Sequence, residues 1–398
     1  MKNYVFAVLA FFCVMMISPS AVLAEGDFQI DGTTLVAYTG TDSTVIIPNG
    51  VTVVGVNAFS KNPKIREVYF SDTVTKIDDG AFEYCANLET VILPNSLMEI
   101  GALAFRGCES LELIEIPEGV GSTGSNAFLE CSSLRAASIP SSLYYIEYGI
   151  FSGCKQLESI SVASDNNKYI SIDNVLYTAD GETLVQYPAG KSEDKVTIKE
   201  GVRKIERSAF NGCDAIKEVV FPNSVTELGV YSFKDCKNLS EIELPQSITA
   251  ISERAFWGCT SLEKAVINNM KASIGEQVFE WNVTLYGAKN SSAEQYAEAN
   301  GLKFEVLESD DETTSVEASE ETSNSEEEES VTASEELDES VSGEDESQEE
   351  EPQEEEKEEK EFDFYRIIFF ILIAVALVSF FGIVITVFKM TSNRNRDE

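Results

Sequence analysis

The chain of 398 residues contains no histidine. Histidine is the usual general base near neutral pH and the commonest side-chain ligand of metal ions. Its absence excludes a Ser-His-Asp triad, a Cys-His catalytic pair and an HExxH zinc motif. Positive charge is also scarce, because 29 Lys and Arg stand against 69 Asp and Glu, a net charge of -40. This balance disfavours nucleic acid as a partner.

Other chemical motifs are missing as well. No two cysteines form a C-x-x-C pair, and the glycine-rich stretch GVGSTG, Gly119 to Gly124, lacks the lysine of a phosphate-binding loop. Carboxylates are so numerous that no acid-base pair stands out from the others. We therefore expect no catalytic residues, no metal site and no cofactor, and a protein that is not an enzyme.

The N-terminus has the pattern of a secretory signal. Lys2 precedes an apolar run from Val5 to Ile17, and small residues lead up to Ala24. A positive start, a short apolar core and a small residue before the cleavage point are typical of such signals. The sequence predicts a signal peptide over residues 1–24 and an exported mature chain.

A second apolar run lies near the C-terminus. Ile367 to Phe388 is 22 residues long and has no charge or proline. At about 1.5 Å per residue, this length is enough to cross the hydrocarbon core of a bilayer. Three basic residues follow the run, which places that end in the cytoplasm by the positive-inside rule. We predict a transmembrane helix over residues 364–388 and a cytoplasmic tail over 389–398.

A strongly acidic segment precedes the predicted helix. Residues 308–361 hold 27 Asp or Glu against two lysines. Ser and Thr fill much of the rest, so little apolar surface is available to offset the entropy cost of folding. The composition predicts a disordered stalk.

An internal repeat occupies the region between signal and stalk. An Ala-Phe pair, or a close variant, recurs with intervals of 23 residues in seven of eight cases, and the eighth interval is 59 residues. The unit follows the pattern A-F-x-x-C-x-x-L-x-x-I-x-I-P-x-S-V-x-x-I. A unit of this size cannot enclose its own core and must stack on copies of itself. The repeat phenylalanines are Phe59, Phe82, Phe105, Phe128, Phe151, Phe210, Phe233, Phe256 and Phe279.

One unit, LETVILPNSLMEIGALAF, shows the local pattern. Val91 and Leu93 are two residues apart, which is the period of a strand, and Pro94 ends the pairing because it has no N–H to donate. The later apolar residues are spaced by three to five, which predicts turns and 3₁₀ segments. The predicted inward set is Leu88, Val91, Leu93, Leu97, Ile100 and Phe105.

These runs resemble the L-x-x-L-x-L segment of leucine-rich repeats, in LETVIL from Leu88 and in LSEIEL from Leu239. The Ala-Phe-x-x-Cys and Ile-Pro-x-x-Val segments are similar to those of BspA-type bacterial surface antigens. The resemblance implies a repeat solenoid over residues 25–307, built mainly of short parallel strands with turns and 3₁₀ segments. It also implies a cell-surface protein of the adhesin kind.

The ends of the repeat array have patterns of their own. Residues 30–38, IDGTTLVAY, predict a hairpin cap, and a related hairpin with an Asp180-Gly181 turn fills an insertion near 165–197. Residues 291–300 predict a short helix that stops at Gly301. These segments would close the solenoid.

Seven cysteines follow their repeat phenylalanines by three positions. Stacked turns would place them about 4.8 Å apart in one line, which is long for disulfide Cβ atoms and unsuited to a tetrahedral metal site. The terminal repeats have Asn62 and Asn282 at this position. We interpret the column as buried free thiols, with an occasional disulfide as the alternative. It consists of Cys85, Cys108, Cys131, Cys154, Cys213, Cys236 and Cys259.

Outward residues of the repeat strand vary between turns and are the candidates for recognition, because extended repeat surfaces often bind partners. The alternative is that they are ordinary exposed strand residues. Three of them would form a modest apolar patch beside Glu115. The candidate residues are Tyr69, Ile92, Leu113, Glu115, Glu243 and Val266.

The sequence therefore predicts a single-pass protein of the cell membrane, anchored by Ile367 to Phe388, with its solenoid outside. We expect a non-enzymatic adhesin that binds an extracellular protein or glycan partner of a host or another cell. The alternative is a structural or regulatory envelope protein that contacts resident membrane or wall components.

Overall fold

The computed structural model describes residues 26–307. Within this range no helix is both long and apolar enough to cross a membrane. Four predicted segments lie outside the described residues, namely the signal peptide 1–24, the acidic stalk 308–361, the transmembrane helix 364–388 and the tail 389–398.

Each 23-residue turn contributes two strands to the solenoid. In one turn, Val91 is the central residue of β7 (Thr90–Ile92) and Ile100 ends β8 (Glu99–Ile100), and both side chains are buried. The second strand lies where the sequence predicted turns and 3₁₀ segments, and no 3₁₀ segment occurs within residues 26–307. Because successive turns stack in register, even two extended residues find hydrogen-bonding partners on both sides. Leu93, predicted to face inward, is half-buried at the edge of the core.

The first segment of the solenoid, residues 26–163, contains one continuous sheet and two shorter ones. After an antiparallel hairpin, every pairing is parallel and joins equivalent residues of successive turns. The continuous sheet has the order β1 (Phe28–Asp31), β2 (Thr34–Tyr38), β4 (Val53–Val54), β6 (Lys76–Ile77), β8, β10 (Ser122–Thr123) and β12 (Tyr145–Ile146). The shorter sheets are β3 (Thr44–Ile46), β5 (Glu67–Tyr69) and β7, and β9 (Leu113–Glu115), β11 (Ala136–Ile139) and β13 (Ser159–Val162).

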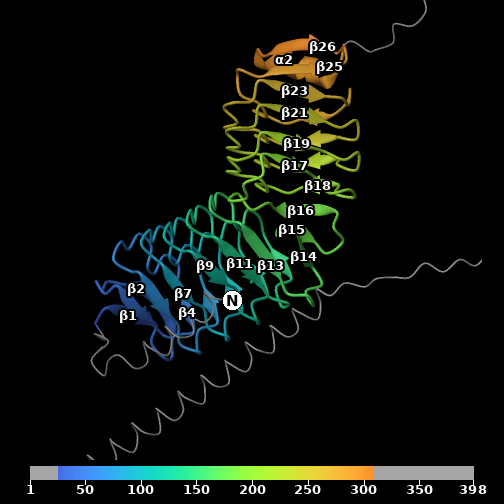
Figure 1. Cartoon of the computed structure of the whole chain (residues 1–398). Coiled ribbons are helices and arrows are strands. Elements are labelled where there is room, and N and C mark those ends of the chain that lie inside the picture. Colours follow the sequence, from blue (N-terminus) through green and yellow to red (C-terminus); the bar gives the residue numbers. More distant parts are fainter. Residues whose placement is uncertain (1–25, 308–398) are drawn as a thin grey trace, which may run out of the picture. The chain divides into compact units, whose positions relative to one another are not determined.

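The second segment, residues 169–307, repeats this plan (Figure 1). Its continuous sheet has the order β14 (Tyr169–Ile172), β15 (Val175–Thr178), β16 (Thr183–Gln186), β18 (Lys204–Ile205), β20 (Glu227–Leu228), β22 (Ala250–Ile251) and β24 (Ser273–Ile274). The shorter sheets are β17 (Lys195–Thr197) with β19 (Glu218–Val220), and β21 (Glu241–Leu244), β23 (Lys264–Ile267), β25 (Thr284–Gly287) and β26 (Lys303–Val306).

The Ala-Phe pair sits at a tight corner of each turn. Around Phe105, Leu103 and Gly107 both have left-handed backbones, with φ of 56° and 68°. Phe105 N donates to the carbonyl of Ala127 in the next turn, at 2.8 Å. The corner thus points the aromatic ring into the core while its backbone bonds to the neighbouring turn.

The repeat phenylalanines form two stacks along the interior. Successive rings from Phe59 to Phe151 have centroids 4.8, 5.2, 5.3 and 5.6 Å apart. From Phe210 to Phe279 the separations are 4.7, 5.3 and 5.3 Å. The rings are close to parallel, and their spacing follows that of the stacked backbones.

The insertion is a second solenoid cap. Residues 181–187, GETLVQY, repeat the pattern of residues 32–38, GTTLVAY. In both, the hairpin strand pairs in parallel with the first short strand of the next turn. Tyr187 stacks on Phe210 with centroids 4.9 Å apart, as Tyr38 packs on Phe59 at 5.1 Å. The chain therefore starts its solenoid twice.

One hairpin serves both segments. Leu176 and Val185 belong to the hydrophobic core of the first segment, whereas Val175, Tyr177 and Leu184 belong to that of the second. Neighbouring residues of a strand point to opposite faces, so a single pair of strands can close two cores. The β15–β16 hairpin is thus an end wall for one segment and a starting wall for the other.

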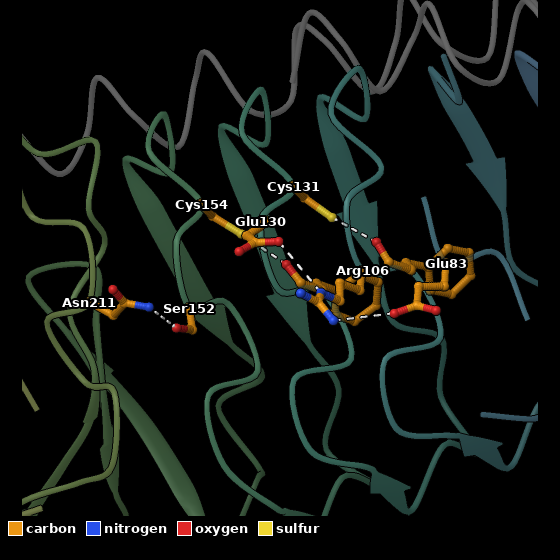
Figure 2. Close-up of polar contacts among 9 residues, drawn as sticks. Glu83, Arg106, Glu130, Cys131, Ser152, Cys154 and Asn211 are labelled. Atoms are coloured by element: carbon orange, nitrogen blue, oxygen red, sulfur yellow. Dashed lines mark hydrogen bonds and ion pairs between the residues drawn. The ribbon is translucent and has the colours of Figure 1, made fainter. Parts of the chain in front are cut away.

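The strand ladders and the ring stack stop at this joint, while one bond of the corner ladder, from Gly153 N to Asn211 O at 3.4 Å, crosses it. Sheets ending at β12 and β13 do not continue into the second segment, and within residues 26–307 no ring contact joins Phe151 to Phe210. Individual polar contacts replace them. Asn211 Nδ2 donates to Ser152 Oγ at 2.5 Å, and Lys155 Nζ lies 3.3 Å from Asp214 Oδ2 (Figure 2 shows the first pair).

A short helix closes the far end. Helix α2 (Ser292–Asn300) begins after Ser291, whose hydroxyl accepts from Glu294 N, and ends at Gly301 with a left-handed backbone. Ala293 and Ala297 are buried against the last turn. Both ends of the helix therefore have the residues expected for capping.

The stacked rings give the first testable prediction. Phe105→Ala removes a fully buried ring that contacts rings on both sides, so the free energy of unfolding should fall by about 3–5 kcal/mol in urea titration. Trp281→Ala is the control, because that aromatic side chain is 85% exposed and its loss should cost within about 0.5 kcal/mol. Equal losses would contradict the role given to the stack.

Candidate binding surface

The longer strand of each turn presents two outward columns of side chains, because alternate residues of a strand face opposite sides. The central residue, such as Val91, points into the core. Parallel register places equivalent residues of successive turns side by side. Any binding surface on this face is therefore assembled from columns whose spacing the stack determines.

In the first segment the predicted apolar patch is smaller than expected. Tyr69 was predicted to be outward and available, but it is only 9% exposed. It lies in register between Ile46 and Ile92, and Ile92 is itself half-buried. Burial raises the pKa of the Tyr69 phenol, and the nearby Glu67 carboxylate adds to the shift.

The patch is also divided. Tyr69 and Ile92 belong to the sheet β3-β5-β7, whereas Leu113 and Glu115 belong to β9-β11-β13. Leu113 is 36% exposed and Glu115 is exposed, so both are accessible. The structure does not join the four residues in one hydrogen-bonded sheet.

In the second segment the outward residues line a groove of about 520 Å³. The groove crosses the boundary between β19 and β21, which belong to different sheets. Glu243 is exposed at this place, whereas Val266, predicted to be outward, is only 6% exposed. Val266 is covered because it lies in register between Glu243 and Tyr286. The groove is lined chiefly by Glu218, Val220, Glu241, Glu243, Lys264, Val266 and Asn268.

Ion pairs hold two of the groove carboxylates. Lys195 Nζ lies 2.8 Å from Glu218 Oε1, and Lys264 Nζ lies 3.7 Å from Glu241 Oε2. All four side chains are about half exposed, so each pair contributes little to stability. Glu243 instead accepts a hydrogen bond from Asn268 Nδ2, at 3.2 Å.

Val220 and Asn268 were not among the candidate binding residues predicted from the sequence. Val220 was visible as an outward residue one repeat before Glu243, and it is 37% exposed. Asn268 follows the end of β23 and stands where the repeat pattern has proline, as in Pro245 one turn before. The break in strand pairing between β19 and β21, over which the groove lies, has no marker in either strand.

The seven cysteines of the repeat column are free and buried. The Sγ atoms of Cys131 and Cys154 each donate to the carbonyl of a phenylalanine in the preceding turn, at 3.1 Å, as Figure 2 shows. Cys85, Cys108, Cys236 and Cys259 make the same contact, at 3.0 to 3.4 Å. Cys213, the first cysteine after the joint, makes none within residues 26–307. The thiols thus continue the bonding between turns.

Burial makes these thiols poor nucleophiles. Desolvation raises the pKa of Cys85 to about 12, and it raises the pKa of Cys108 as well. Only the thiolate attacks electrophiles or binds metals, so the population of reactive groups is very small at neutral pH. Among the described residues, no group of three or more Cys, Asp or Glu is placed to hold a metal ion.

The terminal asparagines take the place of cysteine where a stack ends. Asn62 Oδ1 accepts from Lys64 N at 2.9 Å, and Asn282 Nδ2 donates to Leu262 O at 3.0 Å. Both residues are partly exposed. A polar side chain suits these positions because solvent reaches them.

The stacked two-strand turns and their buried Ala-Phe-Cys corners define a leucine-rich-repeat solenoid. The chain belongs to the BspA-type leucine-rich-repeat family, whose model, described as a BspA type leucine rich repeat region, matches residues 39–176 and 189–292 in six copies. A comparison with curated proteins finds no match.

Solved structures show the same architecture. A leucine-rich repeat protein from Eubacterium ventriosum is 26% identical with a TM-score of 0.56, over 64% of this chain and 71% of that one. The pneumococcal vaccine antigen PcpA is 18% identical with a TM-score of 0.54, over 67% of this chain and 80% of its own. The likeness to PcpA concerns the fold alone.

The cysteine column gives a second prediction. Cys259→Ala should lower the free energy of unfolding by about 1 kcal/mol or more, because it leaves a small cavity and removes the bond to Phe233 O. Thr260→Ala, at the exposed neighbouring position, should change it by less than about 0.5 kcal/mol. Equal changes in the two variants would contradict a packing role for the buried thiol.

Proposed function

We propose that this protein is a non-enzymatic adhesin of the cell surface that binds a partner protein through the strand face of its second segment. The groove across β19 and β21 carries the proposal. It combines aliphatic side chains, carboxylates and an amide on a rigid stack of turns, which is the mixture of apolar anchors and orienting polar groups that recognition sites use. Membership of a repeat family with extended surfaces supports a protein-binding role.

The setting of the solenoid follows from the sequence predictions. An exported chain with an acidic stalk and one membrane helix would hold the strand face away from the cell. A recognition surface in that position suits contact with host proteins, matrix proteins or other cells. On these grounds we propose that the protein is held in the cell membrane.

Adhesion by cells that express the full chain tests this proposal. Val220→Arg places a long charged side chain in the groove, and Leu113→Arg makes the same kind of change at a position of equal exposure, 36% against 37%. Adhesion to surfaces coated with extracellular matrix proteins should fall at least about tenfold for Val220→Arg, and Leu113→Arg should retain it.

Two outcomes would contradict the proposal. Loss of adhesion in Leu113→Arg alone would move the site to the first segment. If no coated surface holds the cells, and cross-linking in intact cells captures only resident membrane or wall proteins, the envelope-protein alternative is favoured instead.

A further inference from the structure

The groove contains one carboxylate that is not neutralised. Glu218 and Glu241 each lie next to a lysine of the neighbouring strand. Glu243 forms no ion pair with any residue of the range 26–307, and its side chain is exposed. The residues that line the groove include three glutamates and a single lysine, Lys264, so the local field is negative.

Apolar side chains flank this carboxylate. Val220 lies one turn before Glu243 in the same outward column, and Val266 pairs with Glu243 in register one turn after. Val220 lies on the neighbouring strand and is within reach of a ligand side chain that contacts Glu243, whereas Val266 is only 6% exposed. Val220 is 37% exposed and offers its methyl groups to the groove.

Asn268 orients the carboxylate. Its Nδ2 donates to Glu243 Oε1 at 3.2 Å and to the carbonyl of Leu244 at 3.0 Å. A side chain tied to the backbone in this way restrains the rotamers of Glu243. The second oxygen, Oε2, makes no hydrogen bond within the described part of the chain and is free to accept one from a ligand.

This arrangement complements a basic side chain. Lysine and arginine have an aliphatic stem and a cationic end group. The stem would pack on Val220 while the end group donates to Glu243, a charge-assisted contact that is stronger than a neutral hydrogen bond. An aliphatic side chain would leave the carboxylate without a partner, and an acidic one would be repelled.

We infer that the groove seats an arginine or lysine of an extended, basic segment of the partner protein, with Glu243 as the residue that selects the positive charge. The inference rests on the proposed function and adds the chemistry of the partner. Arginine is the better fit of the two, because its planar end group can donate two parallel hydrogen bonds to a carboxylate.

The test uses the full chain and a synthetic probe, a twelve-residue peptide of alternating arginine and serine. A second peptide replaces each arginine by citrulline, which has nearly the same shape and no charge. Binding is measured by the slowing of amide hydrogen exchange in residues 216–246, so that peptide attached to the acidic stalk does not contribute. Experiments are run at 0.15 M salt, where distant charges are screened.

The arginine peptide should protect residues 216–246 and the citrulline peptide should not. Glu243→Gln should raise the apparent Kd of the arginine peptide, measured from this protection, by at least about tenfold. Glu115→Gln is the matched control, because it removes the same charge from an exposed outward residue of the first segment, and it should stay within about twofold.

Equal weakening by Glu243→Gln and Glu115→Gln would overturn the inference, since it would mean attraction to net charge alone. Equal protection by the citrulline peptide would overturn it as well. Failure here is distinguishable from failure of the proposed function. If Val220→Arg abolishes cell adhesion but Glu243→Gln leaves it intact, the groove binds a partner, and the inference that this partner presents a basic segment is wrong.

Discussion

The structure depends on contact between successive turns, because 23 residues cannot enclose a hydrophobic core by themselves. Three kinds of contact repeat along the stack: parallel strand pairing, rings about 5 Å apart, and thiol donation to a carbonyl one turn away. They share one spacing, so each reinforces the others. The cysteines thereby become part of the packing, and a residue type often associated with chemistry serves the interior.

The same constraint explains the joint. Where a stack of turns ends, the apolar interior of its last turn must be covered. Where a stack begins, the interior of its first turn must be covered as well. The β15–β16 hairpin does both, with Leu176 on one face and Leu184 on the other. Ring stacking and strand pairing are interrupted there and polar contacts such as Ser152 with Asn211 take over. Coupling between the segments should accordingly be weaker than coupling within them.

Much of this organisation could be predicted from the sequence, because the repeat pattern specifies which residues face inward. Phe105 and Leu97 are buried as the pattern predicts, and the family assignment agrees with the leucine-rich-repeat resemblance. The exposure of the outward residues was harder to predict from the sequence. Tyr69 and Val266 are outward by alternation and still covered, because exposure depends on the size of the neighbours in adjacent turns. The groove could not be predicted either, since the break in strand pairing between β19 and β21 is a tertiary effect.

The recognition proposed at Glu243 relies on the stack in the second segment alone, so the weak coupling between the two segments is the central claim. Native-state hydrogen exchange in increasing urea tests it most directly. The account predicts two blocks of amides that open at different urea concentrations, one covering β4 to β12 and the other β18 to β24, with the boundary at the shared hairpin. A single opening transition across residues 26–307 would contradict it.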